Sequence, residues 1–456
     1  MKYGEVKNMK NQNVTDMTTG SPLKHIFRFA LPLFIGNLFQ QLYNMVDAVI
    51  VGNFVGSDEL AAVGNCGSVN FLFVSLCMGL SVGIGIIVAQ YFGSKDYEMV
   101  QKTIGNAIYV LFAASILVGV LCFAMAPILL KLLHTPDDII GTSILYMRTT
   151  SLGILGIALY NGVAAVLRAL GDSKTSLYFL IVSCVVNVIL DLLFVLGFNW
   201  GVFGVAFATV VAQYICAVAC LIFAYKKVTF FQIKRKHMTL HSMIITKAFG
   251  LGIPIALQSS LISISMMVLQ GVVNSFGKDV MSAYTIVGRI EQIVQQPFGS
   301  IGMALTSYTG QNIGAKKMER VREGYRKSVW IVFAYSMLML PIVYFFGEEI
   351  ISIFGKKPEV ISIGAKALMI DCVCYFPLAL IYVPRAVLNG LGDNRFAMIN
   401  GLTEVGCRIG YSKIFTSIPA LGYLGIFVTT GVTWITTAIV CVGRYWLKCG
   451  RVREEA

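Results

Sequence analysis

Long apolar runs separated by short polar segments dominate the pattern of residues along the chain. Each run is apolar nearly all round a helix rather than on one face, and a helix that crosses a bilayer needs about 20 such residues. We therefore expect an all-α integral membrane protein. Twelve membrane spans are predicted at residues 26–50, 60–86, 103–128, 139–161, 176–197, 202–225, 248–275, 283–307, 328–347, 360–383, 396–417 and 423–446.

The second half of the chain repeats the first at one constant offset along the sequence. Among the matches are Gly56 with Gly277, Gln90 with Gln311, Gly93 with Gly314, Lys95 with Lys316, Asp172 with Asp393 and Gly201 with Gly422. Shared hydrophobicity does not explain matching Gln, Lys and Asp residues. Six crossings return the chain to its starting side, so the halves have the same orientation, and such parallel repeats hold substrate between them near the membrane midplane.

This repeat predicts a domain organisation of two lobes around a central cleft. We expect an N-terminal six-helix lobe at 1–225, a basic cytoplasmic linker at 226–247 and a C-terminal six-helix lobe at 248–456. The linker follows from its composition, because Lys and Arg are concentrated between spans 6 and 7.

The composition supports a membrane protein, since only 13% of residues are charged against about 25% in soluble domains. The net charge of +13 resides mostly in loops on one side, including residues 226–247 and 316–327. This asymmetry is typical of the positive-inside rule and not of nucleic-acid binding. It predicts a plasma-membrane (cell inner membrane) protein with both termini in the cytoplasm. We expect no cleavable signal peptide, because the initial segment MKYGEVKNMKNQNVTDMTTG has no apolar core.

Catalytic and cofactor motifs are missing from the sequence. The eleven cysteines are scattered through apolar segments without a CxxC spacing, which is typical of small buried thiols. No HExxH or Walker pattern occurs, which argues against a membrane-embedded enzyme and against ATP hydrolysis. We expect a protein that is not an enzyme and has no cofactor beyond a coupling ion.

Two aspartates lie deep inside apolar spans. Asp47 ends a polar stripe in span 1, and Asp191 follows Asn187 by four residues in span 5, on the same helical face. A buried carboxylate in lipid costs several kcal/mol unless it is paired, hydrated, protonated or bound to a cation. With Thr209 in span 6, these side chains form a set of hard oxygen ligands suited to Na⁺, or to a proton that two carboxylates share.

The second half does not repeat this set, so the sequence predicts one cation site, in the N-terminal lobe. Glu404 and Arg408 are four residues apart in span 11, and we interpret them as a structural salt bridge. The partners of Arg289, Glu291 and Asp371 are left open.

Amide and thioether side chains are frequent in spans 1, 7 and 8, and such adaptable groups suit varied ligands. We expect the substrate to contact polar and Met residues of these spans. The predicted set is Asn37, Gln40, Tyr43, Asn44, Met45, Gln258, Met266, Gln270, Glu291 and Gln295.

The segment LPLFIGNLFQQLYNMVDAVIVGNFVGSDELAAVG, the AQYFGSKD turn, VLRALGDSKTSL and its second copy VPRAVLNGLGDNRF resemble the MATE (multidrug and toxic compound extrusion) family. The resemblance runs from about residue 22 to residue 447 and is strongest to its bacterial DinF-like and multidrug-pump branch. It implies export of organic cations or amphipathic drugs in exchange for H⁺ or Na⁺. The N-lobe cation site of the family resembles Asp47, Asn187, Asp191 and Thr209, and Tyr43 also matches.

The resemblance gives a functional hypothesis: a secondary active antiporter, expected to be a monomer in the lipid bilayer, whose partners are small molecules. The choice between H⁺ and Na⁺ stays open. A flippase of lipid-linked or polysaccharide substrates is the alternative. Twelve spans and an acidic N-lobe site argue against it, whereas Arg289 and Arg408 keep it open. We also expect proline breaks at Pro32 and Pro254 to let spans 1 and 7 gate the cleft, unless these prolines only mark helix starts.

Overall fold

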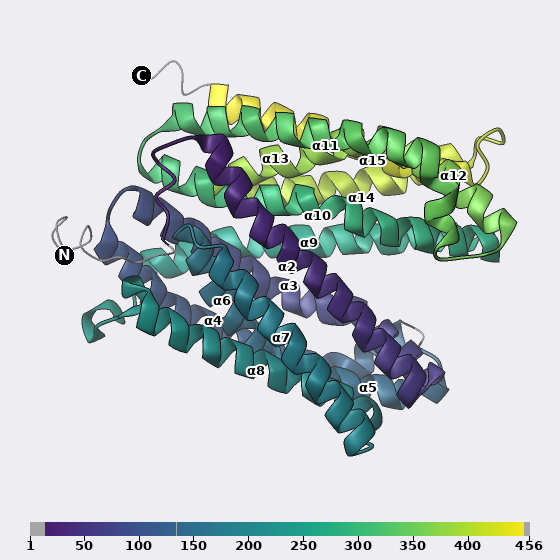
Figure 1. The fold of residues 1–456 in the computed structure, drawn as a ribbon, viewed down its shortest axis with the longest axis horizontal. Coiled ribbons are helices and arrows are strands. Elements are labelled where there is room, and N and C mark those ends of the chain that lie inside the picture. The colour runs from purple at the N-terminus through teal and green to yellow at the C-terminus, as the bar shows by residue number, and fades with distance from the viewer. Residues whose placement is uncertain (1–13, 134, 451–456) are drawn as a thin grey trace. The chain divides into compact units, whose positions relative to one another are not determined.

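The computed structural model describes residues 14–133 and 135–450, which are helical almost throughout and contain no strand (Figure 1). The helices are α2 Pro22–Ile50, α3 Ser57–Gly93, α4 Tyr97–Leu132, α5 Asp137–Ser151, α6 Ile154–Ala169, α7 Lys174–Leu192, α8 Gly201–Lys227, α9 Ser242–Asn274, α10 Lys278–Gly314, α11 Met318–Ser352, α12 Pro358–Val373, α13 Tyr375–Leu391, α14 Asn394–Thr416 and α15 Leu424–Gly450. Short π-helical turns, η1 Val51–Val55 and η2 Leu193–Gly197, extend α2 and α7, and the 3-10 turns η3 Thr229–Phe231 and η4 Arg235–His237 follow α8.

Two of the predicted spans are broken rather than straight. Helices α5 and α6 meet at an angle of 44°, and α12 and α13 at 48°. The residues that cap the second helix of each pair, Gly153 and Cys374, are separated by the same offset as the other repeat partners. The break is therefore part of the repeated unit. A freed carbonyl at the first break, that of Leu152, accepts a hydrogen bond from the Tyr214 hydroxyl at 2.9 Å, as a break inside a membrane requires.

Within the described residues, seven helices are long and apolar enough to cross a membrane, and nine spans result if each bent pair counts as one. The other three long helices are α2, α10 and α14. Each coincides with a predicted span but carries more polar and charged residues: α2 and α10 contain candidate ion-binding and substrate-binding side chains, and α14 contains the Glu404–Arg408 pair. The prediction of an all-α membrane protein with two six-helix repeats is confirmed.

The described chain forms two compact units. Unit 1 takes in residues up to Thr19, Leu31–Ala256 and Gly310–Lys316, and unit 2 takes in Gly20–Ala30, Leu257–Thr309 and the chain from Lys317 on. Helices α2, α9 and α10 each contribute to both units. The predicted bounds of the lobes, with a separate linker at 226–247, stay a prediction.

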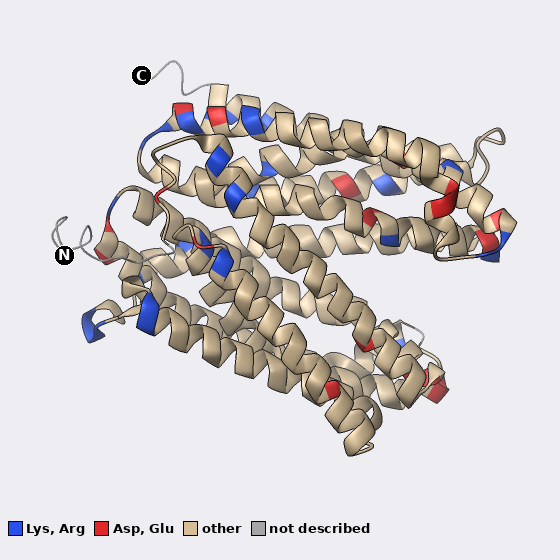
Figure 2. Ribbon diagram, viewed as in Figure 1, with Lys and Arg blue, Asp and Glu red and all other residues tan. Residues whose placement is uncertain are grey.

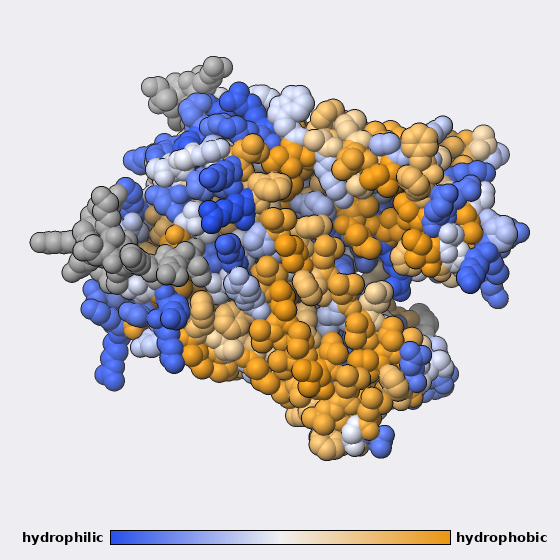
Figure 3. Space-filling view, viewed as in Figure 1, coloured by the Kyte–Doolittle hydropathy of each residue, from blue (hydrophilic) through white to orange (hydrophobic). Residues whose placement is uncertain are grey.

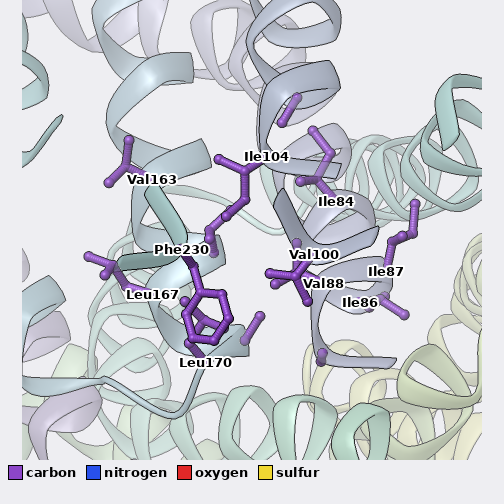
Figure 4. Packing of buried hydrophobic residues seen from close by; sticks show 14 of the residues in the cluster. Ile84, Ile86, Ile87, Val88, Val100, Ile104, Val163, Leu167, Leu170 and Phe230 are labelled. Atoms are coloured by element: carbon purple, nitrogen blue, oxygen red, sulfur yellow. The ribbon is translucent and has the colours of Figure 1, made fainter. Parts of the chain in front are cut away.

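The core of unit 1 is an apolar cluster between α3, α4, α6 and the loop after α8. Figure 4 shows its packed side chains, among them Ile84, Val100, Leu167 and Phe230. Small residues bring the backbone of α9 against α3: a Cβ added at Gly79 would lie 2.5 Å from the Gly252 carbonyl oxygen. Such close approach stabilises helix pairs in membranes, where no hydrophobic force acts between helices.

The ends of α3 and α10 cross within unit 1 in a reciprocal contact. Gly93 lies against the backbone of Gln311, and its repeat partner Gly314 lies against the backbone of Gln90, with no room for a Cβ at either glycine. Each helix is followed by a lysine with a left-handed backbone, Lys95 with φ 62° and Lys316 with φ 58°. The repeat seen in the sequence therefore brings equivalent residues together around a local two-fold relation.

Gln311 also joins the segment before α2 to the end of α6. Its Oε1 accepts a hydrogen bond from the Met17 backbone N–H at 2.8 Å, and its Nε2 donates to the Ala169 carbonyl at 2.8 Å. The neighbouring Gly171 has φ 89° and lies against the Thr15 backbone, where a side chain would collide. A buried amide with both ends satisfied fixes this junction.

Many of the helices expose apolar side chains along their length and carry hydrophilic residues near their ends (Figure 3). Figure 3 shows these apolar residues on one face, and Figure 2 shows that most Lys and Arg residues lie near helix ends. Large side chains such as Leu117, Ile128, Ile189 and Ile439 are more than half exposed. Exposed aliphatic residues in such number fit contact with lipid chains.

Pro32 and Pro254 lie inside helices and do not mark their starts. Helix α2 begins at Pro22 and α9 at Ser242, well before the two prolines. The alternative that the prolines only begin regular helix is therefore wrong.

Replacing Gly314 by Ala should destabilise the protein by about 3 kcal/mol or more, because the new methyl group collides with the Gln90 backbone, which cannot move aside. Gly93→Ala should do the same through the Gln311 backbone. Thermal unfolding in detergent measures the loss. Gly288→Ala on α10 is the matched control, since no atom lies within 4 Å of its added Cβ. Equal melting temperatures for Gly314→Ala and Gly288→Ala would contradict the reciprocal crossing.

Candidate cation site

Both helices that carry the predicted aspartates end in a π-helical turn. Asp47 lies four residues before η1, and Asp191 lies two residues before η2. Buried aliphatic residues of these turns and of α8 pack together, namely Ile50, Val51, Val195 and Val205. Single π turns are rare and occur often at functional sites. Here they connect the carboxyl-bearing ends of α2 and α7 through an apolar contact.

The carboxyl groups of Asp47 and Asp191 lie within hydrogen-bonding reach of each other. Asp191 has no exposed surface, whereas Asp47 is half-buried. Neither residue forms a salt bridge within the described residues, whose ion pairs involve other acids. The sequence therefore predicted correctly that these aspartates have no basic partner.

Several buried polar atoms of this site have no hydrogen-bond partner among the described residues. They are Oδ1 of Asp47, both carboxyl oxygens of Asp191, and Oδ1 and Nδ2 of Asn187. Buried polar atoms in proteins are almost always satisfied. Oxygen atoms that lack a hydrogen-bond partner and lie close together could be satisfied by a bound proton, cation or water.

The remaining predicted residue, Thr209, lies beside the site on α8. Its hydroxyl donates to the Val205 carbonyl at 3.2 Å and lies near the Tyr43 side chain. Tyr146 of α5 is also within electrostatic range of both aspartates. The local sequence around Tyr146 did not single out this position, because the first half of span 4 carries many polar residues and Tyr146 is one among them.

The donor set is small and consists of oxygen atoms. Within the described residues no group of three or more His, Cys, Asp or Glu side chains could hold a metal ion. Two carboxyl groups, one amide oxygen and a hydroxyl are hard ligands, which suit an alkali cation rather than a transition metal. The same two carboxyls, side by side, can also share one proton.

Unit 2 contains a second buried acidic cluster, which the sequence indicated only in part. Arg408 and Glu404 of α14 form the predicted salt bridge, with 3.2 Å between Nη2 and Oε1. Glu291 of α10 and Asp371 of α12 lie within hydrogen-bonding reach of each other and within electrostatic range of Arg408. All four side chains are buried. In contrast, Arg289 is exposed.

The predicted substrate-contacting residues divide between the two units. On α2, Gln40, Asn44 and Met45 are exposed, whereas Asn37 and Tyr43 are half-buried. In unit 2, Gln258 and Glu291 are buried, Met266 is exposed, and Gln270 and Gln295 are half-buried. Several of these are already engaged: Gln270 Nε2 donates to Asn274 at 2.9 Å, and the Tyr382 hydroxyl donates to Gln295 at 3.0 Å. Their role in substrate binding stays a prediction.

Replacing Arg408 by Met should destabilise the protein by about 3–5 kcal/mol, because Glu404 then lacks its buried partner. The double variant Arg408→Met with Glu404→Gln should recover part of that loss, since it removes the stranded charge. Thermal unfolding of both variants in detergent measures the difference. An Arg408→Met protein as stable as the wild type would contradict a structural role for the pair.

Comparisons with known proteins agree with this architecture. The MatE family model matches the chain twice, at residues 32–193 and 254–414. The probable multidrug resistance protein YpnP of Bacillus subtilis is 30% identical over 438 residues, which cover 96% of this chain and 97% of the relative. The multidrug export protein MepA of Staphylococcus saprophyticus is 21% identical over 433 residues, covering 93% and 92%.

Among solved structures, a MOP superfamily transporter from Pyrococcus furiosus is similar in fold, with a TM-score of 0.90 at 22% identity. The match covers 96% of this chain and 98% of that protein. The family match spans well over half of the chain, and the curated relatives are named as multidrug resistance and multidrug export proteins. The chain therefore belongs to the MATE family of multi-pass, multidrug efflux transporters.

Proposed function

We propose that this protein is a secondary active antiporter that exports small organic cations or amphipathic compounds in exchange for H⁺ or Na⁺. The observation that carries the proposal is the adjacency of the half-buried Asp47 and the fully buried Asp191, which have no basic partner and whose buried oxygens lack a hydrogen-bond partner. No other acidic pair within the described part of unit 1 has this arrangement.

Electrostatics makes this pair a coupling site. Two adjacent carboxylates in a low-dielectric interior cannot both be ionised without a counterion. The pair therefore binds one proton or one monovalent cation. Binding neutralises the pair and lets the ends of α2 and α7 pack together through their π turns. Release restores repulsion between the two carboxyls and favours a different arrangement of α2. A ligand that binds one arrangement better than the other then shifts the equilibrium.

The substrate class follows from the chemistry of α2. The same helix carries Asp47 and, one to two turns earlier, the exposed Gln40 and Asn44. A cationic compound near this stripe would compete with the coupling ion for the same negative potential. Exposed Met45 adds a polarisable, adaptable contact for varied apolar parts. We also propose that α2 and α9 bend at their internal prolines during the cycle, and that both termini lie in the cytoplasm of a plasma-membrane protein.

The flippase alternative needs free positive charge for an anionic headgroup. Buried Arg408 is paired with Glu404 and lies near two further carboxyls, so it offers little net positive charge. This neutralisation weakens the case that Arg408 makes for a flippase, whereas the exposed Arg289 is not neutralised in this way.

Asp47→Asn and Asp191→Asn should each reduce coupled efflux of a fluorescent organic cation such as ethidium by at least tenfold. Each change removes one charge of the pair and with it the need for a coupling ion. Efflux from energised cells that express equal amounts of protein measures the effect. Asp138→Asn is the matched control, because Asp138 is an exposed aspartate of the same unit. Normal efflux by either site variant would refute the assignment.

Asn187→Ala and Thr209→Ala should weaken the apparent affinity for the coupling ion by a smaller factor, about three- to tenfold. Neutral oxygens contribute less to a hard cation than carboxylates do. The measurement is the concentration of H⁺ or Na⁺ that gives half-maximal efflux. A larger loss in these variants than in Asp47→Asn would show that the carboxyl pair is not the main ligand.

Ethidium affinity should fall as the coupling ion saturates, because each ligand favours a different arrangement of α2. Binding to the purified protein, measured across pH and across Na⁺ concentration, tests this linkage. An affinity that is constant along both series would contradict exchange at this site.

A further inference from the structure

A deep apolar groove lies on unit 1, away from the carboxyl pair. Its volume is about 690 Å³, and α4, α6 and α8 form its walls, with residues such as Leu111, Val163 and Val218. Polar surface is nearly absent from these walls. Such a volume is within the range of sites that hold small organic ligands, about 300–1,000 Å³.

The dimensions of the groove match one leaflet of a bilayer. Along α8 it extends from Ala217 to Lys226, a rise of about 14 Å at 1.5 Å per residue. The hydrocarbon core of a bilayer is about 30 Å thick, so one leaflet accounts for about half of that. All three wall helices belong to apolar spans, and groove residues such as Leu221 are exposed on the outer surface.

One end of the groove is basic and structurally fixed. Lys226, in the last turn of α8, lines this end beside Phe231, Ile233 and Met238 of the following loop. Asn106 of α4 holds that loop, because its Nδ2 donates to the Thr239 carbonyl at 3.1 Å and its Oδ1 accepts from the His241 N–H at 2.9 Å.

The charge of the loop comes from lysine and arginine rather than histidine. Burial and the neighbouring Lys236 lower the pKa of His237, which disfavours the charged form of its ring. Its Nδ1 accepts a hydrogen bond from the Lys234 backbone N–H at 3.2 Å, which orders the loop. Lys226 is the basic residue that lines the groove end, and Lys234, Arg235 and Lys236 lie in the loop that follows α8.

We propose that this groove is a binding site for one anionic glycerophospholipid of the surrounding membrane. An acyl chain fills the apolar length between α4, α6 and α8, and the headgroup phosphate lies at Lys226. Charge complementarity selects the occupant, since basic pockets between membrane helices at one surface bind anionic headgroups. A zwitterionic lipid gains the same chain contacts but less from the lysine. The site is separate from the cation pair, so the bound lipid is a structural partner rather than the transported compound.

The first test fills the groove. Wild-type protein in nanodiscs of equal phosphatidylglycerol and phosphatidylcholine, released for native mass spectrometry, should carry one phosphatidylglycerol molecule. Val218→Trp should reduce this occupancy at least tenfold, because the indole takes the place of the chain. Ile215→Trp is the control: Ile215 is 44% exposed on α8, against 54% for Val218, but does not line the groove. If Val218→Trp does not fold, Leu221→Trp replaces it.

The second test changes the charge. Lys226→Gln should lower the preference for phosphatidylglycerol over phosphatidylcholine about fivefold, as expected for one lysine at an anionic surface. Lys227→Gln, the adjacent exposed residue outside the groove, should leave the preference unchanged.

Several results would overturn the proposal. Val218→Trp and Ile215→Trp proteins with equal bound lipid would show that the groove is not the site. Equal preferences in Lys226→Gln and Lys227→Gln would remove the role of the lysine. A wild-type dimer that Val218→Trp dissociates would show that a second copy of the chain, and not a lipid, covers the groove.

Discussion

Two carboxyl groups meet in an interior that holds no basic partner for them, and the coupling proposed for this protein depends on that contact. Asp47 and Asp191 come from helices far apart in the sequence, and the fold brings them within hydrogen-bonding reach. In water such a pair would be unremarkable, but with little solvent around it the repulsion has to be relieved by a bound cation or proton. Binding of a cation or proton at the carboxyl pair is therefore connected to the positions of α2 and α7.

The rest of unit 1 supports this contact. Reciprocal glycine contacts at Gly93 and Gly314 fix the ends of α3 and α10, while Gln311 ties the chain before α2 to the end of α6. At the C-terminal ends of α2 and α7, the π turns η1 and η2 contact each other through a small aliphatic cluster. Close backbone crossings thus fix the region where α3 and α10 end. The region where α2 and α7 end contains the two carboxyl groups, and its charge changes when a proton or cation binds.

Much of this arrangement was predictable from the sequence, for physical reasons. Spans could be located because lipid requires continuous apolar helices, and the constant offset between the halves identified the repeat. That offset matched Lys95 with Lys316, and the structure then shows that both lysines have a left-handed backbone. Asp47 and Asp191 were recognisable because intramembrane charge without a partner is costly. Glu404 and Arg408 were predictable as a pair because their spacing is local. The neighbourhood of Glu291 and Asp371 was not, since they lie on helices far apart in the sequence and tertiary packing alone joins them. Breaks at Gly153 and Cys374, and the π turns, leave no hydropathy signal.

Transport in inside-out membrane vesicles, energised in turn by a proton gradient and by a sodium gradient, tests coupling through the carboxyl pair most directly. We expect ethidium to accumulate when one of the two gradients is imposed, and accumulation to stop when that gradient is dissipated. Protein in which Asp47 is replaced by Asn should not respond to either gradient. Accumulation that continues with both gradients dissipated would contradict coupling through the carboxyl pair.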